Sequence, residues 1–273
     1  MKTIKITALL VLLTVILCCG QRAGNNRNNQ PKGDPTSAEN NNQPSETTPP
    51  LDSLVDKNYL LGKFEPSAHP LFVKIDPKLT TIPNGYVRKE VHQAFEKMHA
   101  AAATEGVELT IVSATRNFNA QKRIWESKWN GTRLSEGINL TTIKDPEERA
   151  RMILRYSSMP GTSRHHWGTD IDINSVSPAY FKTPAGMKVY NWLSGNAHHY
   201  GFCQTYTTKD SLRPTGYEEE PWHWSYTPVS SQLLQQYRKY IRFTDIKGFL
   251  GDQTAEPLDV INHYVLGVNP DCK

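Results

Sequence analysis

The chain has 273 residues, a charged fraction of 21% and a formal net charge of only +4. Its Lys and Arg residues are scattered among acidic residues instead of gathering in a basic stripe, so we expect no nucleic-acid partner. The part after residue 50 is long enough to bury one substantial core, and we expect it to act as a monomer.

The N-terminus has the pattern of a secretory signal. Two lysines precede an apolar run over residues 6–17, which Cys18 and Cys19 follow directly. A membrane-spanning helix needs about 20 apolar residues, so this shorter run fits the apolar core of a cleaved signal peptide. The end of the run resembles a bacterial lipobox, and we predict a lipoprotein signal peptide over residues 1–19 with the lipid on Cys19. An ordinary signal peptide with two incidental thiols is the alternative.

Residues 20–50 are predicted to form a disordered tether. Residues 24–50 contain seven Asn and five Pro with almost no apolar side chains, so they cannot bury enough surface to offset the entropy cost of ordering. Such a tether would let a domain over residues 51–273 reach from a membrane into a polymer. We therefore expect a protein of the cell envelope that is held to the membrane by its lipid and, in a diderm bacterium, faces the periplasm.

Helices mixed with a few strands are predicted for residues 51–273. Asp145 and Pro146 have the pattern of a helix start, and Gly201 suits the left-handed end of another helix. In chain order we expect a helix over 87–103, a strand over 107–112, a helix from 119 with Ile124, Trp125 and Trp129 facing inward, helices over 145–156 and 185–199, a strand over 222–226, and helices over 231–242 and 255–266. Without regular βαβ alternation, these elements indicate an α+β fold in which helices flank a small antiparallel sheet.

One further strand, over residues 169–174, alternates strictly between polar and β-branched apolar residues. Ile171 and Ile173 are therefore expected in the core. Asp170 and Asp172 lie together on the opposite face, which is predicted to border a cleft or solvent.

The turn before this strand and a second segment provide candidate metal ligands. His165 and His166 lie in the turn, and Glu220 precedes His223 by three positions in the second segment. Imidazole and carboxylate are good zinc ligands, and a catalytic zinc site needs three protein ligands with one position left for water. The turn and the strand together offer two ligands, the second segment offers the third, and Glu220 is a candidate general base.

These residues resemble the VanY-type D-Ala-D-Ala carboxypeptidases, which are related to the lysostaphin-like peptidases and to the zinc domain of hedgehog proteins. The family signature, S-x-H-x-x-G-x-A-x-D followed far downstream by E-x-W-H, is matched by Ser163, His165, Gly168, Asp172, Glu220, Trp222 and His223. The resemblance covers roughly residues 58–226. It implies one Zn²⁺ ion held by His165, Asp172 and His223, a sheet that carries this site, and Glu220 as the catalytic acid and base.

The resemblance also implies a substrate-binding group. Arg116 and Gln121 match an R-x-x-x-x-Q element that binds the C-terminal carboxylate of the substrate in this family. Ser163 either caps the turn or contacts the substrate.

Asp170 departs from the family pattern, which usually has Ala at this position. Two residues along a straight strand span roughly 6.5 to 7 Å, which is too far for Asp170 and Asp172 to share one ion. The seven-residue spacing from His165 favours Asp172 as the ligand. Asp170 is then expected to orient His166, to contact substrate or to meet solvent.

Glu220 and His223 would point to opposite faces of a regular strand, because they differ by three positions. Pro221 lies between them, and proline belongs at the start of a strand because it cannot donate to the ladder. We therefore expect Glu220 on the loop that precedes the strand, with His223 and Ser225 on the cleft face.

The resemblance implies a zinc metallocarboxypeptidase that hydrolyses the terminal D-Ala of peptidoglycan stem peptides. An LD-carboxypeptidase, a peptidoglycan endopeptidase and a non-catalytic zinc-containing module that binds peptidoglycan remain as alternatives, and the presence of Glu220 favours catalysis. The sequence leaves two questions open: whether Cys203 and Cys272 pair, and whether His166 lines the cleft or packs behind it.

Overall fold

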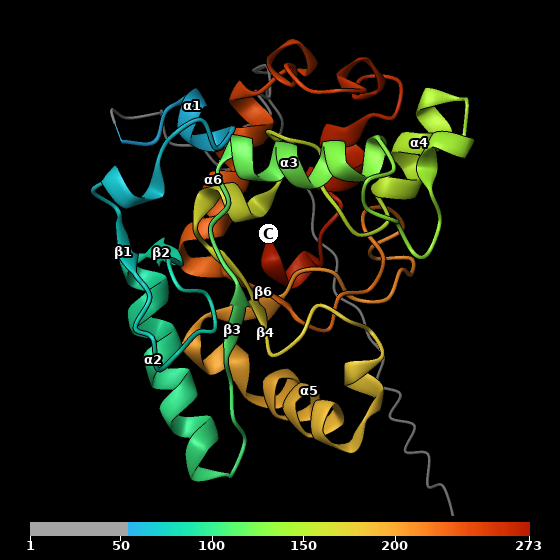
Figure 1. Cartoon of the computed structure of the whole chain (residues 1–273). Helices are drawn as coiled ribbons and strands as arrows, with labels where there is room; N and C mark the ends of the chain where they lie inside the picture. The colour runs from blue at the N-terminus through green and yellow to red at the C-terminus, as the bar shows by residue number, and fades with distance from the viewer. Residues whose placement is uncertain (1–53) are drawn as a thin grey trace, which may run out of the picture. The chain divides into compact units, whose positions relative to one another are not determined.

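The computed structural model describes residues 54–273 (Figure 1). The predicted signal peptide, the lipobox with Cys19 and the tether over residues 20–50 lie outside the described residues. Within the described part, no helix combines the length and the apolar character needed to cross a bilayer.

A four-stranded antiparallel sheet with the strand order β3-β4-β6-β5 carries the polar residues singled out above. Its strands are β3 (Ile111–Ser113), β4 (Asp170–Ile173), β5 (Phe202–Gln204) and β6 (His223–Tyr226). A separate antiparallel pair consists of β1 (Phe72–Lys74) and β2 (Tyr86–Arg88). The α-helices of the described residues are α1 (Lys57–Leu60), α2 (Lys89–Thr104), α3 (Phe118–Trp129), α4 (Pro146–Ile153), α5 (Pro184–Asn196) and α6 (Thr227–Tyr240). Small antiparallel sheets with flanking helices confirm the predicted α+β fold.

The two faces of the four-stranded sheet differ in chemistry. Helices α2 and α5 pack against the face on which Ile171 and Ile173 are fully buried, and Trp224 of β6 belongs to the same apolar cluster (Figure 1). Helices α1, α3, α4 and α6 contribute to a second apolar cluster together with the C-terminal segment. The predicted alternation of β4 is thereby confirmed, and its polar face lies away from the first cluster, where the candidate site forms.

Two predicted helix ends are confirmed. The carboxylate of Asp145 accepts a hydrogen bond of 2.9 Å from the Glu147 amide at the start of α4. The turn that follows α5 ends at Gly201, whose φ of +81° lies in the left-handed region. In α3, Trp125 and Trp129 are buried as predicted, but Ile124 lines a cavity instead of joining the core.

Two other predicted elements differ from the structure. The strand predicted over residues 107–112 is shorter and begins at Ile111. Just before it, the Thr110 amide donates to the side chain of Asn174 at 2.9 Å, and the Thr110 carbonyl accepts the Asn174 amide at 2.8 Å. The helix predicted over residues 255–266 is interrupted at Asp259, whose φ is +46°, and only a π-helical turn over Ile261–Val265 remains.

A disulfide answers the question that the sequence left open for the two cysteines. Cys203 in β5 is bonded to Cys272, with their α-carbons 5.8 Å apart. The bond ties the last residues of the chain to the edge strand of the four-stranded sheet.

Candidate metal centre and active site

Strand register brings Asp172 and His223 together. They are directly opposite each other in the antiparallel pair of β4 and β6, so their side chains project from the same face of the sheet. His165 comes from the short 3₁₀ turn η3 (Arg164–Trp167), and Gly168 with a φ of +71° leads the chain from that turn into β4. The turn thus places the imidazole of His165 next to Asp172 of β4.

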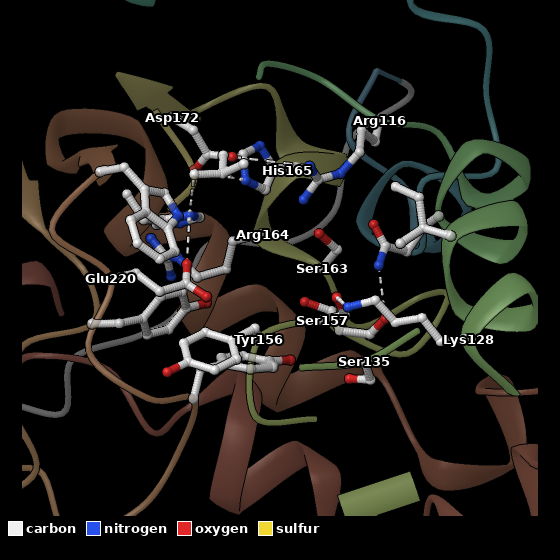
Figure 2. A pocket seen from close by; sticks show the side chains of 18 of the residues that line it. Arg116, Lys128, Ser135, Tyr156, Ser157, Ser163, Arg164, His165, Asp172 and Glu220 are labelled. Atoms are coloured by element: carbon white, nitrogen blue, oxygen red, sulfur yellow. Dashed lines mark hydrogen bonds and ion pairs between the residues drawn. The ribbon is translucent and has the colours of Figure 1, made fainter. Parts of the chain in front are cut away.

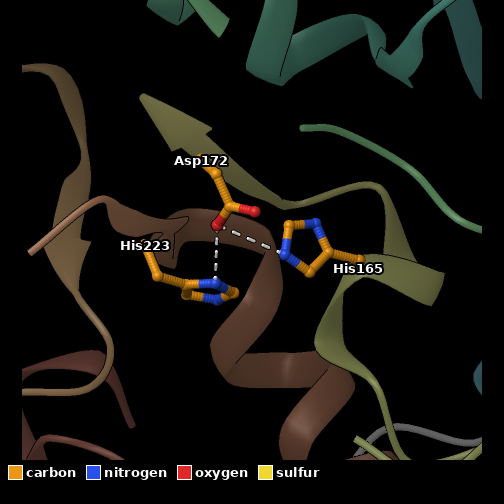
Figure 3. A group of neighbouring side chains, drawn as sticks. All are labelled: His165, Asp172 and His223. Carbon is orange, nitrogen blue, oxygen red and sulfur yellow. Dashed lines mark hydrogen bonds and ion pairs between the residues drawn. The ribbon is translucent and has the colours of Figure 1, made fainter. Parts of the chain in front are cut away.

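The three side chains form a compact donor group (Figure 3). Nε2 of His165 lies 3.4 Å from Oδ1 of Asp172, and Nδ1 of His223 lies 3.0 Å from the same oxygen. One potential ligand atom from each residue lies within 4.8 Å of the other two, and all three residues are buried. Two imidazole nitrogens and one carboxylate oxygen are a donor set found in catalytic zinc sites.

Hydrogen bonds on the outer side of each ring select the nitrogen that faces the donor group. Nδ1 of His165 donates to the Ala114 carbonyl at 2.9 Å, which leaves the lone pair on Nε2. Nε2 of His223 lies 2.9 Å from Oδ2 of Asp170, which leaves Nδ1 for a metal. Histidines that bind metal usually donate their second N–H in this way. The residues present therefore fit a zinc ion.

Glu220 lies beside the donor group. Its Oε2 is 3.6 Å from Nδ1 of His223, and its amide donates to the Tyr206 carbonyl at 2.9 Å. Glu220 precedes β6, which begins at His223, so its predicted place on the loop is confirmed. Burial raises the pKa of Glu220 to about 8. A carboxyl group with such a pKa can both accept and release a proton near neutral pH.

Asp170 belongs to a buried polar network behind the donor group. Its Oδ2 accepts a hydrogen bond of 2.8 Å from Nε of Arg164, and its Oδ1 accepts one of 2.8 Å from the Ser225 hydroxyl. Nη2 of Arg164 also donates to Ser225 Oγ at 2.6 Å, and the side chains of the ion pair are 0% exposed. The expectations that Asp170 orients His166 or meets solvent are therefore wrong, because the β4–β6 register places it next to Ser225 and His223.

The His166 ring does not line the cavity and instead forms hydrogen bonds with two backbone segments. Its Nδ1 donates to the Arg116 carbonyl at 2.6 Å, and its Nε2 accepts the Gly161 amide at 3.0 Å. Burial lowers the pKa of His166 to about 3, which fits a neutral ring with one donor and one acceptor nitrogen. Of the two alternatives left open for His166, the structure favours packing behind the cleft.

A cavity of about 450 Å³ extends from the donor group (Figure 2). Arg116 and Ser163 line it, and Figure 2 shows the Arg116 guanidinium turned toward His165. Nη1 of Arg116 donates to Ser113 Oγ at 2.7 Å and lies 4.0 Å from Oδ2 of Asp172. The buried Ser163 hydroxyl has no hydrogen-bond partner within residues 54–273. Both groups are available to a ligand, while their predicted roles toward substrate stay predictions.

Gln121 also lines the cavity, but the protein already uses part of its amide. Its Nε2 donates to the Ser158 carbonyl at 2.8 Å. Two residues that sequence reasoning missed stand nearby. Lys128 lines the cavity seven residues after Gln121, and a spacing of two helical turns is the signal that could have found it. The ring of Tyr206 packs 4.7 Å from that of His223, and no sequence pattern marked it.

Comparisons with known proteins identify a family for this chain. The family model of VanY, described as D-alanyl-D-alanine carboxypeptidase, matches residues 84–229. A putative carboxypeptidase of Bacillus subtilis (strain 168), YodJ, is 34% identical over 183 residues, which cover 64% of this chain and 59% of that protein. The D-alanyl-D-alanine carboxypeptidase of Enterococcus faecalis (strain ATCC 700802 / V583) is 27% identical over 164 residues, which cover 60% and 57%.

Among solved structures, that of the LdcB LD-carboxypeptidase matches with 25% identity and a TM-score of 0.46, over 71% of this chain and 80% of that one. The chain spans less than two thirds of the length of the two curated relatives. The VanY match nevertheless extends over more than half of the chain and contains all three residues of the donor group. On this evidence the chain belongs to the VanY family of D-alanyl-D-alanine carboxypeptidases.

Proposed function

We propose that this chain is a zinc-dependent D-alanyl-D-alanine carboxypeptidase that removes the terminal D-Ala of peptidoglycan stem peptides. The observation that carries the proposal is that one cavity holds the His-Asp-His donor group, the buried carboxyl of Glu220 and the guanidinium of Arg116. Membership of the VanY family and the name of the Enterococcus faecalis relative support the same class of substrate.

Different residues of the cavity bind the metal and transfer the proton. A zinc ion held by His165, Asp172 and His223 would supply Lewis-acid chemistry and lower the pKa of a bound water. Glu220 removes a proton from the attacking water as the water oxygen forms a bond to the carbonyl carbon of the scissile peptide bond. The same carboxyl then gives the proton to the leaving amine as the C–N bond breaks.

Arg116 sets where the peptide is cut. A guanidinium binds a carboxylate with two parallel hydrogen bonds, and Arg116 lies close to the donor group, with 4.0 Å between Nη1 and Oδ2 of Asp172. A free carboxylate held there places the last peptide bond at the reacting position. The Ser163 hydroxyl is a candidate donor to the carbonyl oxygen, on which negative charge develops.

Product analysis tests the proposal. The purified full-length chain is supplied with zinc and incubated with pentapeptide and tetrapeptide stem peptides, and the products are identified by mass spectrometry. We expect loss of one D-Ala from the pentapeptide only, and no product after chelation. Loss from the tetrapeptide would indicate an LD-carboxypeptidase, and an internal cut would indicate an endopeptidase. Binding without any product would indicate a non-catalytic module, and each of these three results contradicts the proposal.

The proposal includes a location. We propose that the chain acts in the cell envelope, with Cys19 carrying the lipid and residues 20–50 forming the tether. The support is the sequence pattern of the N-terminal residues and the polymeric nature of the proposed substrate.

A further inference from the structure

Lys128 is a buried cation in the wall of the cavity. It lies in α3, is 8% exposed, and its Nζ donates to Ser157 Oγ at 2.6 Å. An ammonium group has three donors. Within residues 54–273 no carboxylate lies within ion-pair distance of Lys128. Donors of Lys128 thus remain for a ligand in the cavity.

A buried cation without an ion pair is expected to cost the fold stability. Burying an ammonium without an anionic partner is unfavourable, and the chain could place an apolar side chain there instead. Burial, together with the positive charge of Arg133, lowers the pKa of Lys128 to about 8, although the carboxyls of Glu220 and Glu136 act in the opposite direction. A costly buried cation that lines a substrate cavity is a candidate binding group.

The surroundings of Lys128 favour an anionic ligand. Arg133 lines the same cavity and forms no ion pair within the described residues, while Glu136, which also lines it, is paired with Arg155 at 2.8 Å. The Ser157 hydroxyl adds a neutral donor. In Figure 2, Lys128 lies on the side of the view opposite Glu220, and Ser157 lies between the two. The cavity wall around Lys128 therefore presents positive charge and hydroxyl groups.

We propose that Lys128 and Ser157, with Arg133 at the rim, form a subsite for a second carboxylate of the peptide substrate. The inference rests on the proposed carboxypeptidase function. Because that reaction releases only one residue, the second carboxylate lies on the N-terminal side of the scissile bond. Gln121, which is predicted to bind the terminal carboxylate together with Arg116, lies seven residues before Lys128 in α3, or about 10 Å along the helix. An extended peptide spans about 3.3 to 3.6 Å per residue. The carboxylate is thus expected two or three residues before the scissile bond.

The test uses peptides that end in D-Ala-D-Ala and carry either Glu or Gln at the second or third residue before the scissile bond. The full-length, zinc-loaded chain is compared with Lys128→Met and with Lys122→Met as a matched control. Lys122 lies in the same helix, donates to the Gly248 carbonyl and is absent from the cavity lining. Dissociation constants of the same peptides are measured by calorimetry on zinc-loaded Glu220→Gln, with and without the Lys128 substitution.

We expect the wild type to prefer one Glu peptide over its Gln counterpart by about 10- to 100-fold in kcat/KM, the effect of one charged hydrogen bond. Lys128→Met should abolish this preference, while Lys122→Met should keep it. A wild type that hydrolyses both peptides equally, or a Lys128→Met that keeps the preference, overturns the subsite and leaves the proposed function intact. Lys128-dependent binding of the Glu peptide without any hydrolysis supports the subsite and refutes the proposed function. Absence of both Lys128-dependent binding and hydrolysis refutes the subsite and the proposed function.

Discussion

Oδ2 of Asp170 lies 2.9 Å from Nε2 of His223 and also accepts the Nε–H of Arg164 at 2.8 Å. The carboxylate of a buried ion pair thus contacts the His223 nitrogen that faces away from the donor group. The VanY pattern usually has Ala at the position of Asp170, and in this chain the guanidinium of Arg164 balances the charge of the carboxylate found there. Such outer partners fix the orientation of a metal-binding histidine and increase its basicity.

Replacing Asp170 with Ala should therefore weaken metal binding. We expect the zinc dissociation constant to rise by about 10- to 100-fold, measured by competition with a chromogenic chelator. The same change leaves Arg164 buried without its carboxylate, which should lower the free energy of unfolding by about 3 to 5 kcal/mol. Chemical denaturation of the metal-free protein measures that loss.

The double variant Arg164→Met/Asp170→Ala separates the two effects. It removes both charges, so the free energy of unfolding should recover most of the loss, because no unpaired charge remains buried. Zinc binding should stay weak, because His223 still lacks its partner. Zinc affinity of the wild-type level in the double variant would show that Asp170 does not position His223.

Glu220→Gln should greatly reduce turnover without removing the metal. The amide cannot accept the proton of the attacking water, so kcat should fall by about 100- to 10,000-fold. Zinc content, measured by atomic emission, should stay at the wild-type level because Glu220 is outside the donor group. Retention of full activity would refute the assigned role of Glu220.

Arg116→Gln should impair substrates with a free C-terminus selectively. Loss of a charged hydrogen bond to the terminal carboxylate should lower kcat/KM by about 10- to 100-fold. A peptide with an amidated C-terminus lacks that carboxylate and should be cleaved equally poorly by the wild type and the variant. Steady-state assays of both peptides, with zinc content as the control, measure the difference. An equal loss for both peptides would place Arg116 elsewhere in the mechanism.

Lys128 should make stability depend on pH in a definite direction. The pKa of Lys128 is lowered from 10.5 to about 8, so the unfolded chain holds this proton more tightly than the folded chain. The resulting cost is fully present below pH 8 and disappears as the pH rises toward 10.5. Lys128→Met should thus raise the free energy of unfolding at pH 7 by on the order of 1 to 3 kcal/mol. Urea denaturation of the metal-free proteins from pH 7 to 10 should show this difference shrinking, and a constant difference would contradict the assignment.

The predicted lipid anchor can be tested with a pair of cysteine variants. Cys19→Ala should abolish incorporation of a clickable fatty acid in cells, whereas Cys18→Ala should keep it, because the lipid attaches to the residue that becomes the new N-terminus. In-gel fluorescence of the purified chain measures incorporation. Labelling that depends on Cys18 would shift the cleavage site by one residue, and labelling that depends on neither cysteine would contradict the anchor.

Local patterns in the sequence were sufficient for the fold class, whereas the three metal ligands were assigned by the resemblance to the VanY family. The alternation around Ile171 and Ile173 reports which face of a strand is buried, because neighbouring side chains point in opposite directions. The proline before His223 likewise places Glu220 on the loop. These features depend on residues within a few positions of one another, which the amino-acid order specifies directly.

The tertiary structure alone decided the features that join distant segments. His223 and Asp172 are 51 positions apart, and only the register between β4 and β6 shows that Asp170 meets the other nitrogen of the same ring. The pairing of Arg164 with Asp170, the disulfide and the cavity around Lys128 likewise depend on how separate elements pack. Sequence order identified the groups able to bind a metal and move a proton, whereas packing decided which atoms of those groups face one another.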